Sequence, residues 1–190
     1  RREPGAPPDA LAAIATIPSY DALGVAVRKE IGVTCLTELA EAKPRLRVSL
    51  RGGRPNHLVH RVVDDVLAAV GLRLADLQAW GGTIRYDDEL PHLADRAEAL
   101  RTGAVDAVID EGTYNWVDLA VGSGMRFLAI DDAPMARLEA MGYRPGMLTR
   151  QRYPALDADV RTLDFSGWLI FTLRDTADEL VTFFCEALAQ

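Results

Sequence analysis

The order of segments along the chain predicts an α/β domain with a largely parallel sheet and flanking helices. Short apolar runs of strand length alternate with stretches whose apolar residues recur at helical spacing. A parallel strand connection needs a crossover, and a helix supplies one. The chain has 190 residues, of which 49% are hydrophobic, and this is enough for one globular core or two small lobes.

The first half of the chain contains three predicted strands and two predicted helices. Val62 and Val66 belong to one apolar stripe of the strongest helix, and Gly71 ends it. Pro44 ends the helix before it. In chain order the elements are a strand at Leu11–Ile17, a strand at Leu23–Val27, a helix at Thr34–Ala42, a strand at Leu46–Leu50 and a helix at Leu58–Val70.

The second half continues the alternation and then changes character. Residues 143–159 are rich in turn formers, including Pro145, Gly146 and Pro154, so we expect a connection between subdomains there. The predicted elements are helices at Pro91–Thr102, Asn115–Val121 and Pro134–Met141, strands at Ala104–Ile109, Arg126–Ile130 and from Val160 through Phe171, and a terminal helix opened by a capping box at Thr176–Glu179.

Charge and composition exclude several classes of protein. The net charge of -7 and the scattered basic residues argue against a nucleic-acid partner, because phosphate binding needs clustered Lys and Arg. No apolar run is long enough to span a bilayer, and the Pro-rich residues 1–10 predict a disordered leader. The two cysteines, Cys35 and Cys185, lie among apolar neighbours, which predicts two buried thiols and no disulfide framework.

No motif in the sequence indicates catalysis, a bound cofactor or a metal site. His57, His60 and Asp64 fall on one helix face, but no second cluster completes a metal site. The serines have no activating motif beside them, and the glycine spacing matches neither a dinucleotide-binding fingerprint nor a phosphate-binding loop. We therefore expect a protein that is not an enzyme and has no cofactor.

Two polar turns follow predicted strands and are the expected ligand-binding positions, because ligands of α/β sheets bind beyond the carboxyl ends of strands. In the first turn, two glycines let the backbone approach a ligand, the following helix start suits a carboxylate or phosphate, and arginine adds a clamp. The alternative is that the glycines only turn the chain and the arginines are solvated. The candidate residues of this turn are Arg51, Gly52, Gly53, Asn56 and His57.

The second turn combines a hydroxyl, an amide and aromatic faces, which is typical of small-molecule pockets. Its candidate residues are Gly112, Thr113, Tyr114 and Trp116. The alternative places Trp116 in the core and makes Thr113 an ordinary helix cap.

Several segments resemble one family of transport receptors. Leu23–Val33 is similar to a strand of the family and its following "dsGI" turn, and Leu36–Lys43 is similar to its "sl-dLkGK" helix. Glu98–Ala107 is similar to its "eaLkdGkiDA" element. Residues 153–162 are similar to its "YPg-d-dv-T" segment. The family is that of the TRAP-associated extracytoplasmic immunogenic (TAXI) solute receptors, and the resemblance implies a fold like that of type II periplasmic binding proteins.

The chain departs from the family in two respects. The "GapGSGT" loop is replaced by residues 51–57, so Asn56 and His57 would substitute for the family's Ser and Thr ligand donors. The opening of the first lobe is absent from the alignment. The resemblance thus implies a second α/β lobe at residues 21–145, with residues 11–20 and 146–190 as the remnant of the first lobe.

The resemblance implies an extracytoplasmic, periplasmic or cell-surface receptor with a signal sequence. It would bind a small organic acid or amino acid through a carboxylate, without catalysis, and deliver it to the permease subunits of a TRAP-type transport system. The first alternative is a cytoplasmic effector-sensing domain of the LysR-regulator type, which has the same lobe architecture. An enzyme on the same scaffold is the second alternative.

Overall fold

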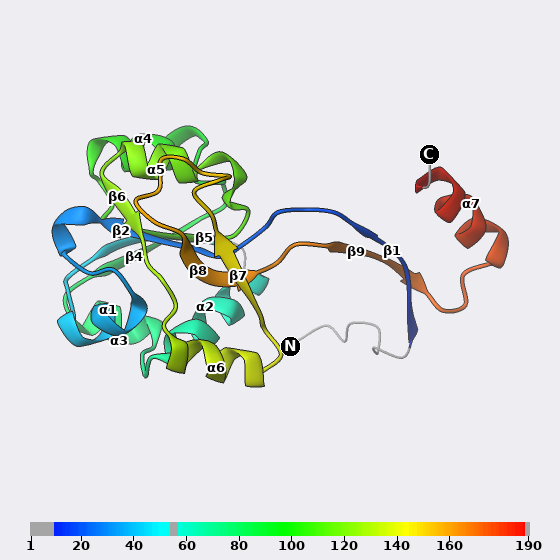
Figure 1. Ribbon diagram of the computed structural model, residues 1–190, viewed down its shortest axis with the longest axis horizontal. Helices are drawn as coiled ribbons and strands as arrows, with labels where there is room; N and C mark the ends of the chain where they lie inside the picture. Colours follow the sequence, from blue (N-terminus) through cyan, green and yellow to red (C-terminus); the bar gives the residue numbers. More distant parts are fainter. Residues whose placement is uncertain (1–9, 54–56, 189–190) are drawn as a thin grey trace. The chain divides into compact units, whose positions relative to one another are not determined.

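The protein is described by a computed structural model that covers residues 10–53 and 57–188 (Figure 1). The chain forms two compact units. The larger unit runs from Tyr20 to Phe165, and the smaller unit consists of the segments before and after it. The larger unit is therefore one continuous stretch of chain.

A five-stranded mixed sheet forms the centre of the larger unit. Its strands are β2 (Gly24–Arg28), β3 (Arg47–Arg51), β4 (Thr83–Asp87), β5 (Ala107–Asp110) and β6 (Met125–Phe127), in the order β4-β3-β5-β2-β6. Strand β3 is parallel to β4 and β5, whereas β2 is antiparallel to both of its neighbours. The α/β class is confirmed. Four strands run in one direction, as expected, and β2 is the exception.

Helices cover both faces of this sheet (Figure 1). On one face lie α4 (Ala94–Thr102) and α5 (Val117–Gly122), and on the other lie α1 (Leu36–Ala42), α2 (Leu58–Ala69), α3 (Leu74–Ala79) and α6 (Asp132–Ala140). Successive strand residues point to opposite faces, so each strand contributes to two cores. In β2, Val25 and Val27 pack with the α2 side, while Ala26 packs with the α4 side.

Residues 143–159 do not form a connection between subdomains, and this prediction is wrong. They contain β7 (Arg144–Leu148), which pairs antiparallel with β8 (Val160–Asp164). Both strands belong to the larger unit, which continues to Phe165. Leu148, Tyr153 and Leu156 are buried in the core on the α4 side, so apolar packing holds this turn-rich segment against the sheet domain.

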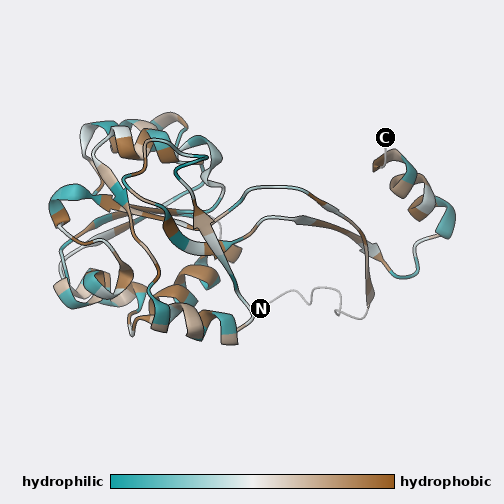
Figure 2. Cartoon of the chain, in the orientation of Figure 1, coloured by the Kyte–Doolittle hydropathy of each residue, from teal (hydrophilic) through white to brown (hydrophobic). Residues whose placement is uncertain are grey.

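The smaller unit has no interior of its own among its described residues. Strands β1 (Leu11–Ile17) and β9 (Trp168–Leu173) form a two-stranded antiparallel ribbon, and α7 (Asp178–Leu188) follows. Figure 2 shows hydrophobic residues along this ribbon and on α7, and none of the described residues here is buried. The predicted leader lies almost wholly outside the described residues, and the interpretation of these segments as a first-lobe remnant stays a prediction.

Both cysteines are free, and neither is buried. Cys35 is partly buried and Cys185 is exposed, so the expectation of two buried thiols is wrong. Cys185 lies on α7, whose apolar residues have no covering layer in the described part of the chain. Among the described helices, none combines the length and apolarity needed to cross a bilayer.

Candidate functional site

The two turns predicted from the sequence lie at one edge of the central sheet. Arg51 ends β3 opposite Asp87 of β4, and Leu50 pairs with Ile109 just before the end of β5. Because these three strands are parallel, their carboxyl ends meet at the same edge. Strand β2 is antiparallel and begins there, since Gly24 pairs with Asp110. We refer to this as the carboxyl edge.

A buried ionic cluster occupies the carboxyl edge, with Arg96 of α4 at its centre. The Arg96 side chain is 2% exposed and forms an ion pair with Asp110, which is fully buried. Its Nε donates to Ser49 Oγ at 2.9 Å and lies 3.5 Å from Asp87 Oδ2, and its Nη1 donates to the Glu89 carbonyl at 2.6 Å. Ser49 in turn donates to Asp87 at 2.6 Å.

Three polar atoms of this cluster have no hydrogen-bond partner among the described residues. They are Arg96 Nη2, Arg51 Nη1 and Asp110 Oδ1, and all three are buried. Arg51 Nη1 lies 3.5 Å from Asp110 Oδ1, close enough for an ion pair. A buried guanidinium nitrogen without an acceptor is costly unless a ligand or water supplies one. The cluster therefore has unused hydrogen-bonding capacity at the place where a ligand is expected.

The cluster contains charged groups of both signs. Arg51, Arg85 and Arg96 all lie within ion-pair distance of Asp87 or Asp110. Two further carboxylates lie nearby, because Glu111 acts on the charge of Asp110 and Asp88 borders Gly53. Burial raises the pKa of Asp110 from its ordinary value of 3.8 to about 6, although the charges of Arg96 and Arg51 act in the opposite direction. Burial also lowers the pKa of Arg96, against the attraction of Asp110. The groups open to an anionic ligand are the guanidinium nitrogens Arg51 Nη1 and Arg96 Nη2, which have no hydrogen-bond partner among the described residues.

The glycine turn after β3 borders this cluster. Gly52 has a φ of +104°, and a Cβ there would lie 2.5 Å from His60 Nε2. A Cβ on Gly53 would lie 2.7 Å from Asp88 Oδ1. The positive φ and the close approach of His57 and His60 favour glycine at position 52, whereas a Cβ at position 53 would meet only the end of the Asp88 side chain.

The start of α2 follows the same turn. His57 is its N-cap residue, and its Nδ1 accepts a hydrogen bond from the Val59 N–H at 3.3 Å. Arg51 contacts Asp110, the Gly52 N–H donates to the Asp87 carbonyl at 2.9 Å, and His57 lies beside Gly52. The predicted ligand residue Asn56 lies outside the described residues. The part of the first turn that the structure describes lies at the carboxyl edge.

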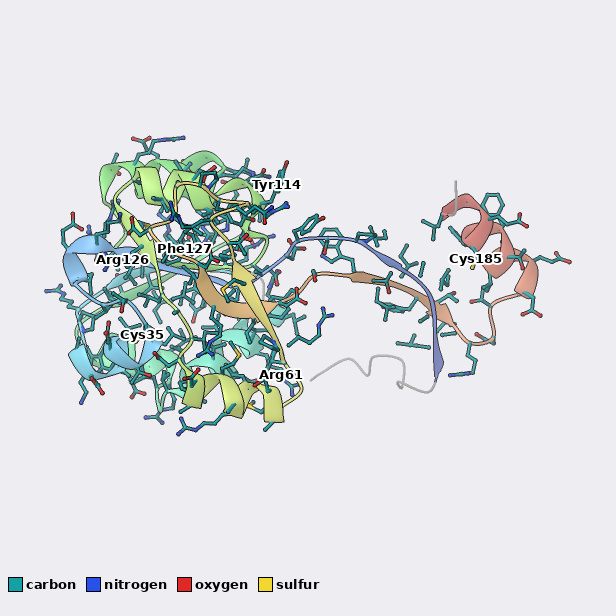
Figure 3. The ribbon with its side chains drawn as sticks, viewed as in Figure 1. Cys35, Arg61, Tyr114, Arg126, Phe127 and Cys185 are labelled. Atoms are coloured by element: carbon teal, nitrogen blue, oxygen red, sulfur yellow. The ribbon has the colours of Figure 1, made fainter. Side chains whose placement is uncertain are left out.

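The residues of the second turn differ in exposure: some lie at the surface and others in the core. Gly112 has a φ of +66°, and the Thr113 hydroxyl is buried 3.2 Å from the Tyr153 hydroxyl. Tyr114 is 68% exposed and is labelled in Figure 3. Trp116 is fully buried, its ring centroid 5.0 Å from that of Phe127, so it belongs to the core as in the alternative interpretation. Its ring is not available to a ligand.

Sequence reasoning missed the residues at the centre of the cluster, Arg96, Asp110, Ser49 and Asp87. One signal was present in the sequence: Arg96 lies on the same helical face as Ala99 and Leu100, both of which are buried. An arginine within an apolar helix face needs a buried partner, and Asp110 at the end of an apolar strand is such a partner.

A separate cavity of about 560 Å³ lies along the edge strand β6. It is lined by residues of α1, β6 and the segment 156–160, and it contains none of the residues predicted for the site. Figure 3 labels Cys35, Arg126 and Phe127 in this region. The carboxyl edge and this cavity are therefore distinct features of the larger unit.

Comparison with known proteins gives structural neighbours only. No family model matches the sequence, and no curated protein matches it. The structure is similar to the second substrate-binding domain of a Streptococcus pneumoniae protein described as an amino acid ABC transporter, with a TM-score of 0.42 and 12% identity over 94% of this chain and 58% of that chain.

Two further solved structures are similar at the same level. One is the L-cystine solute receptor of Neisseria gonorrhoeae, with a TM-score of 0.40 and 10% identity over 97% of this chain and 56% of that chain. The other is an ancestral cyclohexadienyl dehydratase, with a TM-score of 0.36 and 13% identity over 94% of this chain and 54% of that chain. The chain spans a little over half the length of each of these proteins.

Proposed function

We propose that the larger unit binds a small carboxylate-bearing solute at the carboxyl edge, without catalysis. The observation that carries this proposal is the buried guanidinium of Arg96, whose Nη2 has no acceptor among the described residues. Guanidinium groups bind carboxylates through two parallel hydrogen bonds, and Arg51 Nη1 is a second guanidinium nitrogen without an acceptor among the described residues.

Arg51 is the residue that would meet the solute first. Its side chain is 21% exposed, whereas the side chains of Arg96 and Asp110 are 2% and 0% exposed. A carboxylate that approaches Arg51 would compete with Asp110 for Arg51 Nη1, which now lies 3.5 Å from Asp110 Oδ1. The proposal therefore includes a small rearrangement of Arg51 that gives the solute access to the buried cluster.

The wider role proposed here is that of an extracytoplasmic receptor that delivers its solute to the membrane subunits of a transporter. The solute would be a small organic acid or an amino acid. The choice of a TRAP-type transporter rests on the resemblance of the sequence to the TAXI receptors. The solute-binding function itself rests on the carboxyl edge and does not depend on the type of transporter.

The proposal is tested first by a thermal-shift screen of the chain with monocarboxylates, dicarboxylates, amino acids, amines and inorganic phosphate. A ligand at a hundred times its Kd adds about 2.7 kcal/mol to the free energy of unfolding, so a bound acid raises Tm visibly. We expect shifts from acids and none from amines without a carboxylate. A panel in which only amines shift Tm would contradict the proposal.

The site is tested with Arg51→Ala, measured by calorimetric titration of the acid that gives the largest shift. Loss of a charge-assisted hydrogen bond weakens binding by about 1.5–3 kcal/mol, or roughly ten- to a hundredfold. Arg61→Ala is the matched control, because Arg61 lies on α2 with its side chain 76% exposed and its ion-pair contact to Asp65 is long, at 3.9 Å. Equal affinities of R51A and R61A would remove the carboxyl edge from the binding site.

A further inference from the structure

Three tyrosines surround the guanidinium of Arg152. Its Cζ lies 4.0 Å from the ring centroid of Tyr20, 5.3 Å from that of Tyr114 and 5.8 Å from that of Tyr153. Its Nε also donates to the Tyr153 hydroxyl at 3.4 Å. These four residues, called here the tyrosine–arginine cluster, come from three separate segments of the larger unit. Cation–π contacts hold them together.

The cluster lies at the carboxyl edge. Tyr114 follows β5 by four residues, and Tyr20 precedes β2, whose first residue pairs with the last residue of β5. Tyr153 is tied to the same place, because its hydroxyl is 3.2 Å from that of Thr113. The tyrosine–arginine cluster therefore belongs to the sheet edge at which we place the solute, and this inference rests on that proposed function.

Two of the rings in this cluster are open to solvent. Tyr20 and Tyr114 are each 68% exposed, which is unusual for aromatic rings that are held in fixed stacking contacts. Arg152 has no carboxylate within ion-pair distance among the described residues, whereas Arg51 and Arg96 both contact Asp110. The charge of Arg152 is therefore available to aromatic rings, and its guanidinium keeps the rings of Tyr20 and Tyr114 in place.

We propose that the tyrosine–arginine cluster is the specificity-determining part of the solute site and selects aromatic carboxylates. The ring of the solute stacks on the exposed face of Tyr114, in the field of the Arg152 guanidinium. The carboxylate of the solute binds Arg51 and the cluster around Arg96. Arg152 acts as a positioning residue for the two exposed tyrosines and as a partner for the π-system of the solute.

The test compares two acids of equal charge and similar size, phenylacetate and cyclohexylacetate, by calorimetric titration of the whole chain. Stacking on Tyr114 and the cation–π contact with Arg152 both favour an aromatic ring, so the wild type should bind phenylacetate roughly five- to a hundredfold more tightly. Tyr114→Leu and Arg152→Met should each lower this ratio by at least about threefold while leaving the affinity for cyclohexylacetate nearly unchanged. Arg150→Met, two residues from Arg152 in the same exposed segment, should keep the wild-type ratio.

The affinity ratio separates this inference from the proposed function. Arg51→Ala should lower the affinity for both acids by the same factor and leave the affinity ratio unchanged, because Arg51 contacts the carboxylate and not the ring. A wild-type ratio of one, or a ratio that survives Tyr114→Leu, would overturn the selection of aromatic acids while leaving the carboxylate site intact. Failure of the wild type to bind phenylacetate would overturn it as well, even if the thermal-shift screen finds another acid.

Discussion

Arg96 and Asp110 form a buried ion pair at the carboxyl edge of the sheet. Both side chains are almost fully removed from solvent, so each charge depends on the other. Arg96→Met would leave the Asp110 carboxylate without its main partner, and the free energy of unfolding should fall by about 3–5 kcal/mol. Urea denaturation at pH 7 measures this loss.

A suitable control for that substitution is Arg101→Met on the same helix. The Arg101 side chain is 56% exposed, and its only described ion pair is a 3.9 Å contact to Glu98. We expect a change within about 0.5 kcal/mol. A similar loss of stability in both variants would show that the buried pair has no special role.

The raised pKa of Asp110 predicts how stability depends on pH. Because its pKa is about 6 in the folded protein and 3.8 ordinarily, the folded state binds the proton more tightly than the unfolded state. This contribution to stability is fully present below pH 4 and is lost as the pH rises through about 6. The unfolding free energy of wild type relative to Asp110→Asn should therefore fall by about 2 kcal/mol from pH 4 to pH 7.

Urea titrations of both proteins across that range provide the check. Subtracting the unfolding free energy of Asp110→Asn from that of the wild type removes the pH dependence due to other carboxylates. Asp106 is one of these, and its hydrogen bond with Arg47 lowers its pKa. A difference between the two proteins that stays constant with pH would contradict the assignment of this titration to Asp110.

The sequence predicted the glycine turn beside the ionic cluster better than the buried residues at the centre of that cluster. Arg51 and Gly52 follow a strand in an obvious glycine turn, so local pattern was sufficient to find them. Arg96 and Asp110 are 14 residues apart and meet only because α4 packs across the end of β5. Trp116 was a candidate ligand-binding residue because of its residue type. Its ring instead packs in the core against Gly24, where the absence of a side chain leaves room for it.

Among the elements, β2 and the segment leading into α5 approach each other unusually closely. A Cβ on Gly24 would lie 2.5 Å from Trp116 Cζ2 and 3.0 Å from Phe127 Cε1, and both rings are buried. Gly24→Ala should therefore destabilise the larger unit by about 1–3 kcal/mol through overpacking. Thermal unfolding followed by circular dichroism measures the change.

Gly122→Ala serves as the comparison for Gly24→Ala. Gly122 ends α5, and a Cβ there would meet no atom within 4 Å. Alanine also has the higher helix propensity, so Tm should stay the same or rise slightly. Equal losses in the two variants would mean that the contact with Trp116 does not limit the packing.

Element prediction succeeded where the apolar pattern was strong and local. The helix expected at residues 58–70 is α2 at Leu58–Ala69, and the strand expected at Leu11–Ile17 is β1 with the same bounds. Strand β4 was missed because Thr83–Asp87 has one apolar aliphatic residue, Ile84, and is held by pairing with β3. The antiparallel direction of β2 was missed because its neighbours β5 and β6 follow it by more than 75 residues.

For the whole molecule, the two units differ in how they are stabilised. The larger unit has two apolar cores, whereas no described residue of the smaller unit is buried. An isolated two-stranded ribbon is only marginally stable in water. In hydrogen exchange, amides of β1 and β9 should therefore exchange about a thousandfold faster than those of β2 and β5, which corresponds to about 4 kcal/mol in the free energy of opening.

Hydrogen exchange of the whole chain, followed by mass spectrometry, gives the exchange rates of the ribbon and of the central sheet in one experiment. Protection of β9 equal to that of β5 would show that the ribbon opens only with the larger unit. In that case the division of the chain into two units would have no counterpart in its stability.

The larger unit begins and ends at neighbouring backbone positions. The Phe165 N–H donates to the Asp21 carbonyl at 2.9 Å, and Ala22 forms a bridge with Asp164. A stretch of chain with adjacent ends can be grafted into a surface turn of an unrelated host, because the host needs only two neighbouring attachment points. Residues 20–165 therefore have the geometry of a unit that can be inserted into another protein without altering the path of the host chain, and the proposed acid-binding site would move with it.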